Sequence, residues 1–128
     1  KGQIFIHEIH PFCEMLLLDE VENPDVLQIV EPYFKAEPYV EYGGLDYVGK
    51  SQYTSSKPQY WFVHKLSDIL MALIDNQVSI QHFSEYEFDI SGEHKRIEQA
   101  RAGIPLSYIL IGKKADRKTP PGVDPSPA

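Results

Sequence analysis

Apolar residues occur in short clusters along the chain, and the spacing within each cluster predicts the element that it forms. Residues 3–10 hold a nearly continuous apolar run, which is typical of a strand buried on both faces of a sheet. Because proline cannot donate to a strand ladder, we expect this strand to end at Pro11. Residues 66–76 instead place Leu and Ile on one helical stripe, and Asn76 is expected to close this helix in a left-handed conformation.

The second half of the chain predicts two more strands around a short helix. Residues 78–88 form a long strand pattern whose apolar phase changes near His82, so a bulge or bend is expected there. Residues 93–102 predict a short helix with Gly103 as its cap. A last apolar run at 106–111 predicts the final strand.

A shorter helix is predicted before Pro32. Asn23, Pro24 and Asp25 have the order of an N-cap, a first-turn proline and a first-turn acid, and apolar residues follow them. The helix is expected to stop at the proline.

Residues 33–61 predict an antiparallel hairpin with exposed aromatic faces. Tyrosine and phenylalanine recur there among glycine, serine and threonine, which is the composition of strands joined by turns. Gly43-Gly44 is interpreted as a turn within this hairpin.

Composition and charge narrow the class of protein. The net charge of −7 argues against a nucleic-acid partner that is bound through its phosphates. The only basic cluster lies at residues 113–118 and is interpreted as a solvated strand end. Cys13 is the only cysteine, so no internal disulfide forms, and we interpret it as small buried filler in a cytoplasmic protein. No apolar run approaches the length of a membrane span.

Three segments, taken in order, resemble the C-terminal half of a class I S-adenosylmethionine-dependent methyltransferase. The opening "KGQIFIHEIHPF" resembles the fifth strand of that family, and "YWFVHKLSDILMALIDNQVSIQHFSEYEF" resembles its next helix and sixth strand. The segment "IPLSYILIGKK" resembles the seventh strand, which inserts antiparallel between the fifth and the sixth. The resemblance implies an α/β fold: the C-terminal portion of a Rossmann-like sheet, with an aromatic antiparallel hairpin as its insertion.

This resemblance also implies a division of the chain and of the enzyme. Residues 1–112 would be the C-terminal part of a methyltransferase domain, residues 12–62 its substrate-capping insertion, and residues 113–128 a disordered, proline-rich tail. The family binds its cofactor with a Gly-rich loop on the first half of the fold, and this sequence has no such loop. We therefore expect a substrate-side fragment that acts on a small molecule, has no cofactor site of its own and is inactive alone.

Two polar residues at the tip of the first strand are candidates for acid–base chemistry. Ligands of parallel sheets bind at the carboxyl ends of the strands, which is where Glu8 and His10 lie. His10 is the better base because histidine titrates near neutral pH, although a histidine that caps the strand end is the simpler interpretation. For Glu8, a structural hydrogen bond competes with a functional role.

Aromatic residues and one histidine are the candidates for substrate binding. Tyr60, Trp61 and His64 precede the helix on the expected ligand side of the sheet, and their rings suit a flat or cationic substrate. Tyr39 and Tyr42 are candidates for a lid over it. Ordinary packing of the hairpin, or helix capping by the histidine, remains the alternative for each.

The two alternatives to a methyltransferase fragment are a metal site and a non-catalytic binding module. The five histidine and glutamate candidates for metal binding include His7 and Glu8, whose side chains point to opposite faces of a strand, so no metal is predicted. The alternative function is a non-catalytic α/β binding module that dimerises. Its basis is the bare apolar edge of the first strand, which would recruit a second copy or the missing half of the same fold.

Overall fold

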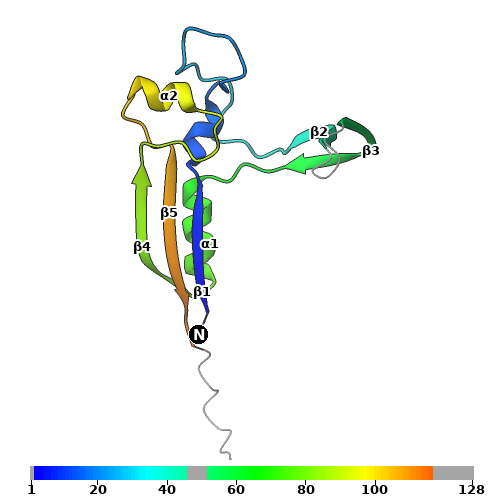
Figure 1. Cartoon of the computed structure of the whole chain (residues 1–128). Helices are drawn as coiled ribbons and strands as arrows, with labels where there is room; N and C mark the ends of the chain where they lie inside the picture. The colour runs from blue at the N-terminus through cyan, green and yellow to red at the C-terminus, as the bar shows by residue number, and fades with distance from the viewer. Residues whose placement is uncertain (1, 46–51, 117–128) are drawn as a thin grey trace, which may run out of the picture.

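The computed structural model describes residues 2–45 and 52–116, which form a mixed α/β unit with two antiparallel sheets (Figure 1). Two α-helices and one short 3-10 helix accompany five strands among the described residues. In chain order the elements are β1 (Gln3–Ile9), the 3-10 helix η1 (Pro11–Met15), β2 (Tyr39–Leu45), β3 (Gln52–Trp61), α1 (Leu66–Asp75), β4 (Val78–Tyr86), α2 (Lys95–Ala100) and β5 (Ser107–Lys114).

The main sheet has the strand order β1-β5-β4, with β5 antiparallel to both neighbours. The two outer strands therefore run parallel to each other. This is the order and direction that the family resemblance implied for the three strands. The predicted irregularity near His82 is confirmed, because the β4–β5 register shifts between Ile80 and His82.

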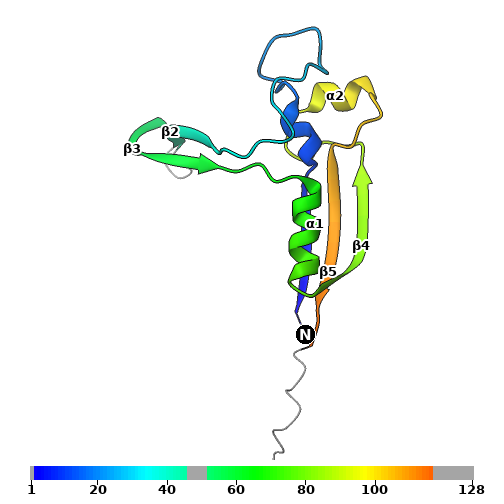
Figure 2. The same cartoon turned by 180° about the vertical axis from the view of Figure 1, so that it is seen from behind.

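One face of this sheet is covered and the other is open. Figures 1 and 2 show α1 lying along one face, whereas no helix of the described residues lies on the opposite face. The prediction that the first strand is buried on both faces is wrong for the described residues. Phe5 is 65% exposed, because no helix of the described residues covers its face of the sheet, and Ile4 on the other face is still 38% exposed.

Leu110 of β5 is fully buried within the main sheet, and a larger buried cluster sits at the end of the sheet beneath η1 and α2. Cys13, Leu16, Ile97 and Leu106 form it, each at most 4% exposed. The prediction for Cys13 is confirmed: its side chain is fully buried, and its thiol donates to the Pro105 carbonyl at 3.3 Å. Burial also raises the pKa of this thiol to about 12.

The two α-helices are confirmed, with different residues closing them. α1 ends one residue before Asn76, whose amide donates to the Ala72 carbonyl, and the left-handed conformation falls on Gln77 with φ 58°. α2 is shorter than predicted and is closed by left-handed Arg101, φ 50°, rather than by Gly103. No helix in the described ranges is long and apolar enough to cross a membrane.

The helix predicted before Pro32 does not form. Instead, the Asn23 side chain accepts from the Asp25 N–H at 2.8 Å, and the Asp25 side chain accepts from the Leu27 N–H at 3.1 Å. These two side-chain turns satisfy the backbone groups that would start a helix, so they compete with it. Ile29 then pairs with Leu16 in an isolated antiparallel bridge.

The aromatic hairpin is confirmed as β2 paired antiparallel with β3, and it projects away from the main sheet (Figure 1). Gly43 is not in a turn. It lies at a register shift inside β2 with φ 105°, a conformation that glycine adopts without strain. Residues 46–51, which connect the two strands, lie outside the described residues.

The predicted start of the tail is wrong. Lys113 and Lys114 belong to β5, where they pair with Ser79 and Val78 of β4. The strand continues because β4 offers partners up to its first residue. The rest of the predicted tail, residues 117–128, lies outside the described residues.

Candidate functional site

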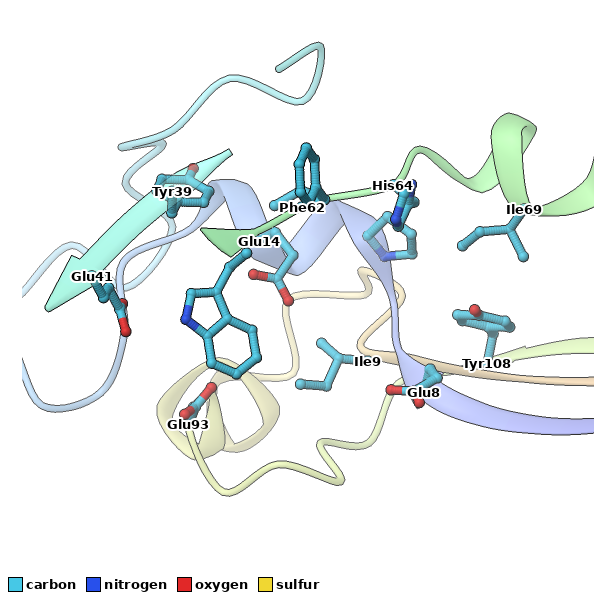
Figure 3. Close-up of a pocket in the computed structure, with 13 residues that line it drawn as sticks. Glu8, Ile9, Glu14, Tyr39, Glu41, Phe62, His64, Ile69, Glu93 and Tyr108 are labelled. Carbon is cyan, nitrogen blue, oxygen red and sulfur yellow. The ribbon is translucent and has the colours of Figure 1, made fainter. Parts of the chain in front are cut away.

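A cavity of about 540 Å³ opens where the carboxyl end of β1 meets the base of the hairpin (Figure 3). Carboxylates and aromatic rings dominate its lining. The lining residues are Glu8, Ile9, Pro11, Glu14, Tyr39, Glu41, Trp61, Phe62, Val63, His64, Ile69, Glu93 and Tyr108.

Several separate parts of the chain converge to build this cavity. β1 ends at Ile9, and Pro11 turns the chain into η1, which brings Glu14 to the wall. The start of β2 supplies Tyr39, and the end of β3 supplies Trp61. The extended segment between β3 and α1 then adds its side chains, including the predicted His64.

Glu8 and Tyr108 form the floor of the cavity on the sheet. They are directly paired across β1 and β5, so their side chains lie on the same face. Glu8 is exposed toward the cavity rather than buried, which removes the need for a structural partner. Burial and the nearby charge of Glu8 raise the pKa of the Tyr108 hydroxyl, which keeps this group protonated.

Tyr108 is held firmly at the wall of the cavity. Its side chain is 2% exposed. The ring is held by tilted or edge contacts with Phe83 and His10, at centroid distances of 5.9 and 6.2 Å. A fixed hydroxyl at the wall of a cavity is suited to bind an occupant.

His10 lies beside the cavity but does not line it. Its Nδ1 accepts from the Phe12 N–H at 3.2 Å, which caps η1, and its Nε2 lies 2.8 Å from a Glu85 carboxylate oxygen. With Nδ1 accepting, Nε2 carries the proton and donates to Glu85. Both ring nitrogens are therefore engaged, and the predicted role of His10 as a base stays a prediction that competes with these bonds.

The other predicted site residues divide into two groups. Tyr39, Trp61 and His64 line the cavity, as expected for substrate contacts. Tyr42 and Tyr60 do not line it and are 65% and 58% exposed on the hairpin. Alternation along a strand explains the split, because Tyr60 lies on the opposite face of β3 from its neighbour Trp61.

Besides Tyr108, the side chains of Glu14 and Tyr39 in the cavity wall have raised pKa values. Burial raises the pKa of Glu14, with a further increase from Glu93 and a partial offset from His94. Loss of hydration, together with a hydrogen bond and charge from Glu31, raises the pKa of Tyr39 to about 12. Near neutral pH the Tyr39 ring is thus an uncharged aromatic surface.

Sequence reasoning missed part of the wall. Glu14, Glu41 and Glu93 come from three separate segments, and no local spacing relates them. Tyr108 could have been predicted from the sequence. The resemblance implied that the first and last strands pair antiparallel, so a residue of the last strand must lie opposite Glu8. Its exact partner depends on register, which only the structure fixes.

Two arrangements within residues 2–45 and 52–116 bear on a metal ion and on the cofactor's glycine loop. The described residues contain no cluster of three His, Cys, Asp or Glu side chains that could hold a metal ion. Gly43 lies in a hairpin bulge rather than after a parallel strand, so the glycine pair does not form the loop that cradles S-adenosylmethionine.

Comparison of the chain with protein-family models, with curated proteins and with solved structures gives no match. Function is therefore inferred from the geometry of the cavity. The carboxylates of the cavity can attract a cation, and the carboxylates and His64 can accept a proton. The aromatic rings can hold a flat or cationic group.

Proposed function

We propose that this chain forms the substrate side of an S-adenosylmethionine-dependent methyltransferase that acts on a small molecule. One observation carries the proposal: β5 runs antiparallel between two parallel strands, and a cavity opens at the carboxyl end of one of them. Open sheets with parallel strands bind ligands at that edge. A cavity lined by aromatic and aliphatic side chains together with several convergent polar groups is typical of a small-molecule site.

The cavity residues take distinct roles in this proposal. Tyr39 and Trp61 hold the acceptor molecule between the hairpin and the sheet. Where the acceptor atom carries hydrogen, its bond to the methyl carbon would form as the bond from that carbon to the sulfonium sulfur breaks, and Glu8 and His64 at the wall can accept the proton that the acceptor releases. In the proposed reaction, this chain binds the acceptor and holds a base beside it in the same cavity.

The cofactor would be bound by a different part of the same fold. The bound cofactor supplies an electrophilic methyl group, and the described residues of this chain do not form its cradle. The outer edge of β1 is unpaired among the described residues, so a further strand of a cofactor-binding half can add there. A reducing, cytoplasmic setting agrees with the buried free thiol of Cys13.

An isotope-transfer assay tests this function. The polypeptide produced from the natural gene is incubated with S-adenosylmethionine labelled in its methyl group and a small-molecule extract of the source cells. We expect label to enter a small molecule, and we expect the 128-residue chain alone to give no calorimetric signal with S-adenosylmethionine. Absence of transfer to any small molecule contradicts the function, and tight binding by the chain alone contradicts the division of roles.

One feature favours a second function, a non-catalytic module that dimerises. The open face of the sheet carries Phe5, and the free edge of β1 lies next to it, which together suit pairing with a second copy. The same assay separates the two functions. A module predicts a stable dimer and no transfer of label, whereas the methyltransferase predicts transfer that depends on the cavity.

A further inference from the structure

The cavity at the end of β1 has a one-sided charge. Every acidic or basic side chain in its lining other than His64 is a glutamate or a tyrosine, and no lysine or arginine of the described residues lines it. The four glutamates are Glu8, Glu14, Glu41 and Glu93, and none has a salt-bridge partner in the described part of the chain. Such a lining repels anions and leaves four carboxylates to be neutralised by an occupant.

Aromatic rings stand among these carboxylates. Figure 3 shows Tyr39, Phe62 and Tyr108 around the same space as Glu14 and Glu93. Aromatic faces attract cations, and cages of aromatic rings recognise quaternary ammonium groups. The Tyr39 ring already attracts an ammonium within the chain, because Nζ of Lys35 lies 4.4 Å from its centroid.

The Tyr108 hydroxyl adds a hydrogen-bond donor to the cavity wall. The Tyr108 side chain is 2% exposed and lines the cavity, so its hydroxyl is fixed where it can meet an occupant. A protonated phenol donates, and the carboxylate of Glu8 beside it makes a second anion unfavourable there. A neutral oxygen of the occupant satisfies the hydroxyl without adding negative charge.

We propose that the cavity binds a small organic cation, an ammonium compound that also carries a neutral oxygen acceptor for Tyr108. Carboxylates and aromatic faces hold the ammonium group, and the Tyr108 hydroxyl donates to the oxygen. The occupant's role as methyl acceptor rests on the proposed function. Its binding to the chain does not.

A pair of probes with one shape and different charge tests the charge requirement. Choline and 3,3-dimethyl-1-butanol differ in the positive nitrogen, which is carbon in the neutral alcohol. We expect titration of the 128-residue chain, followed by nuclear magnetic resonance, to give a dissociation constant about tenfold lower for choline than for the alcohol. Equal affinities, or no binding of either probe at millimolar concentration, overturn the proposal.

Variants locate the binding within the cavity. Glu14→Gln is expected to weaken choline binding severalfold, whereas Glu20→Gln, an equal charge change at an exposed residue outside the cavity, leaves it unchanged. Tyr108→Phe is expected to weaken choline several-fold but to leave tetramethylammonium, which has no oxygen, unaffected. An equal loss in Glu14→Gln and Glu20→Gln would mean general charge attraction and contradicts the site.

The outcomes separate this inference from the proposed function. If the natural polypeptide methylates a neutral or anionic molecule and the chain does not prefer choline, the inference fails and the function stands. If the chain prefers choline through these residues but no methyl transfer occurs, the function fails and the cation site stands.

Discussion

The surroundings of a side chain decide its reactivity and its pKa in this protein. Cys13 is a potential nucleophile, but full burial against backbone carbonyls makes it a packing residue. Asp89 shows the opposite balance. Burial alone would raise its pKa, yet hydrogen bonds from Ser91, His94 and Gly92 outweigh burial and lower it. Cys13 thus packs in the buried cluster, and the Asp89 carboxylate holds the turn before α2.

The Cys13 thiol is expected to be unreactive in the folded protein. Its pKa of about 12, against 9.0 for the ordinary thiol, leaves about a thousandfold less thiolate at pH 8. Because the folded-state pKa is raised, its contribution to stability is fully present below about pH 9 and is lost as pH rises toward 12. Rates of maleimide labelling in buffer and in denaturant measure this, and equal rates contradict it.

Among the elements, β5 is the one that fixes the site, because it pairs with both outer strands and carries Tyr108. Its tightest point is Gly112. A Cβ there would meet Val78 Cγ1 at 2.5 Å and Ile4 Cγ2 at 3.0 Å, so the side chains of both neighbouring strands occupy the space above this glycine. The close approach of the three strands depends on it.

Gly112→Ala is expected to lower the free energy of unfolding by about 1–3 kcal/mol, since overpacking displaces stiff β-branched neighbours. Gly2→Ala is the matched control, because nothing lies within 4 Å of a Cβ at that position. Urea unfolding of both variants measures the difference. A Gly112→Ala protein as stable as the control would show that β1 and β4 move apart without cost.

Local patterns predicted the elements, whereas contacts between distant segments decided what the patterns missed. The spacing of Leu66 to Ile74 was enough for α1, and the phase change near His82 was enough for the bulge. The helix expected after Asn23 failed because side-chain turns competed with it. Glu14 and Glu93 join the cavity through packing of η1 and the segment before α2, which no single-segment pattern encodes.

At the scale of the whole molecule, burial is uneven. The core gathers at the cavity end, while α1 contains no fully buried residue and the opposite face of the sheet is open. Covering that face requires another element, which in the proposed enzyme is the cofactor-binding half and in the alternative module is a second copy.

We expect the 128-residue chain to form dimers in solution through β1 when no other half is present. Phe5→Asp should shift it to monomer with its circular dichroism unchanged, because the Phe5 side chain is 65% exposed in the single chain. Tyr42→Asp, equally exposed on the hairpin, is the control and should remain dimeric. Sedimentation velocity measures the masses, and a monomeric wild-type chain contradicts this expectation.

The most direct test of the central claim is whether methyl transfer depends on the cavity at the end of β1. It compares kcat/KM for transfer of labelled methyl by the natural polypeptide carrying Glu8→Gln, His64→Ala or Tyr42→Phe. We predict a loss of at least about tenfold for the first two, which remove a cavity carboxylate and a cavity base, and no change for Tyr42→Phe, which lies outside the cavity. Unchanged transfer in both cavity variants would contradict the claim that the acceptor binds there.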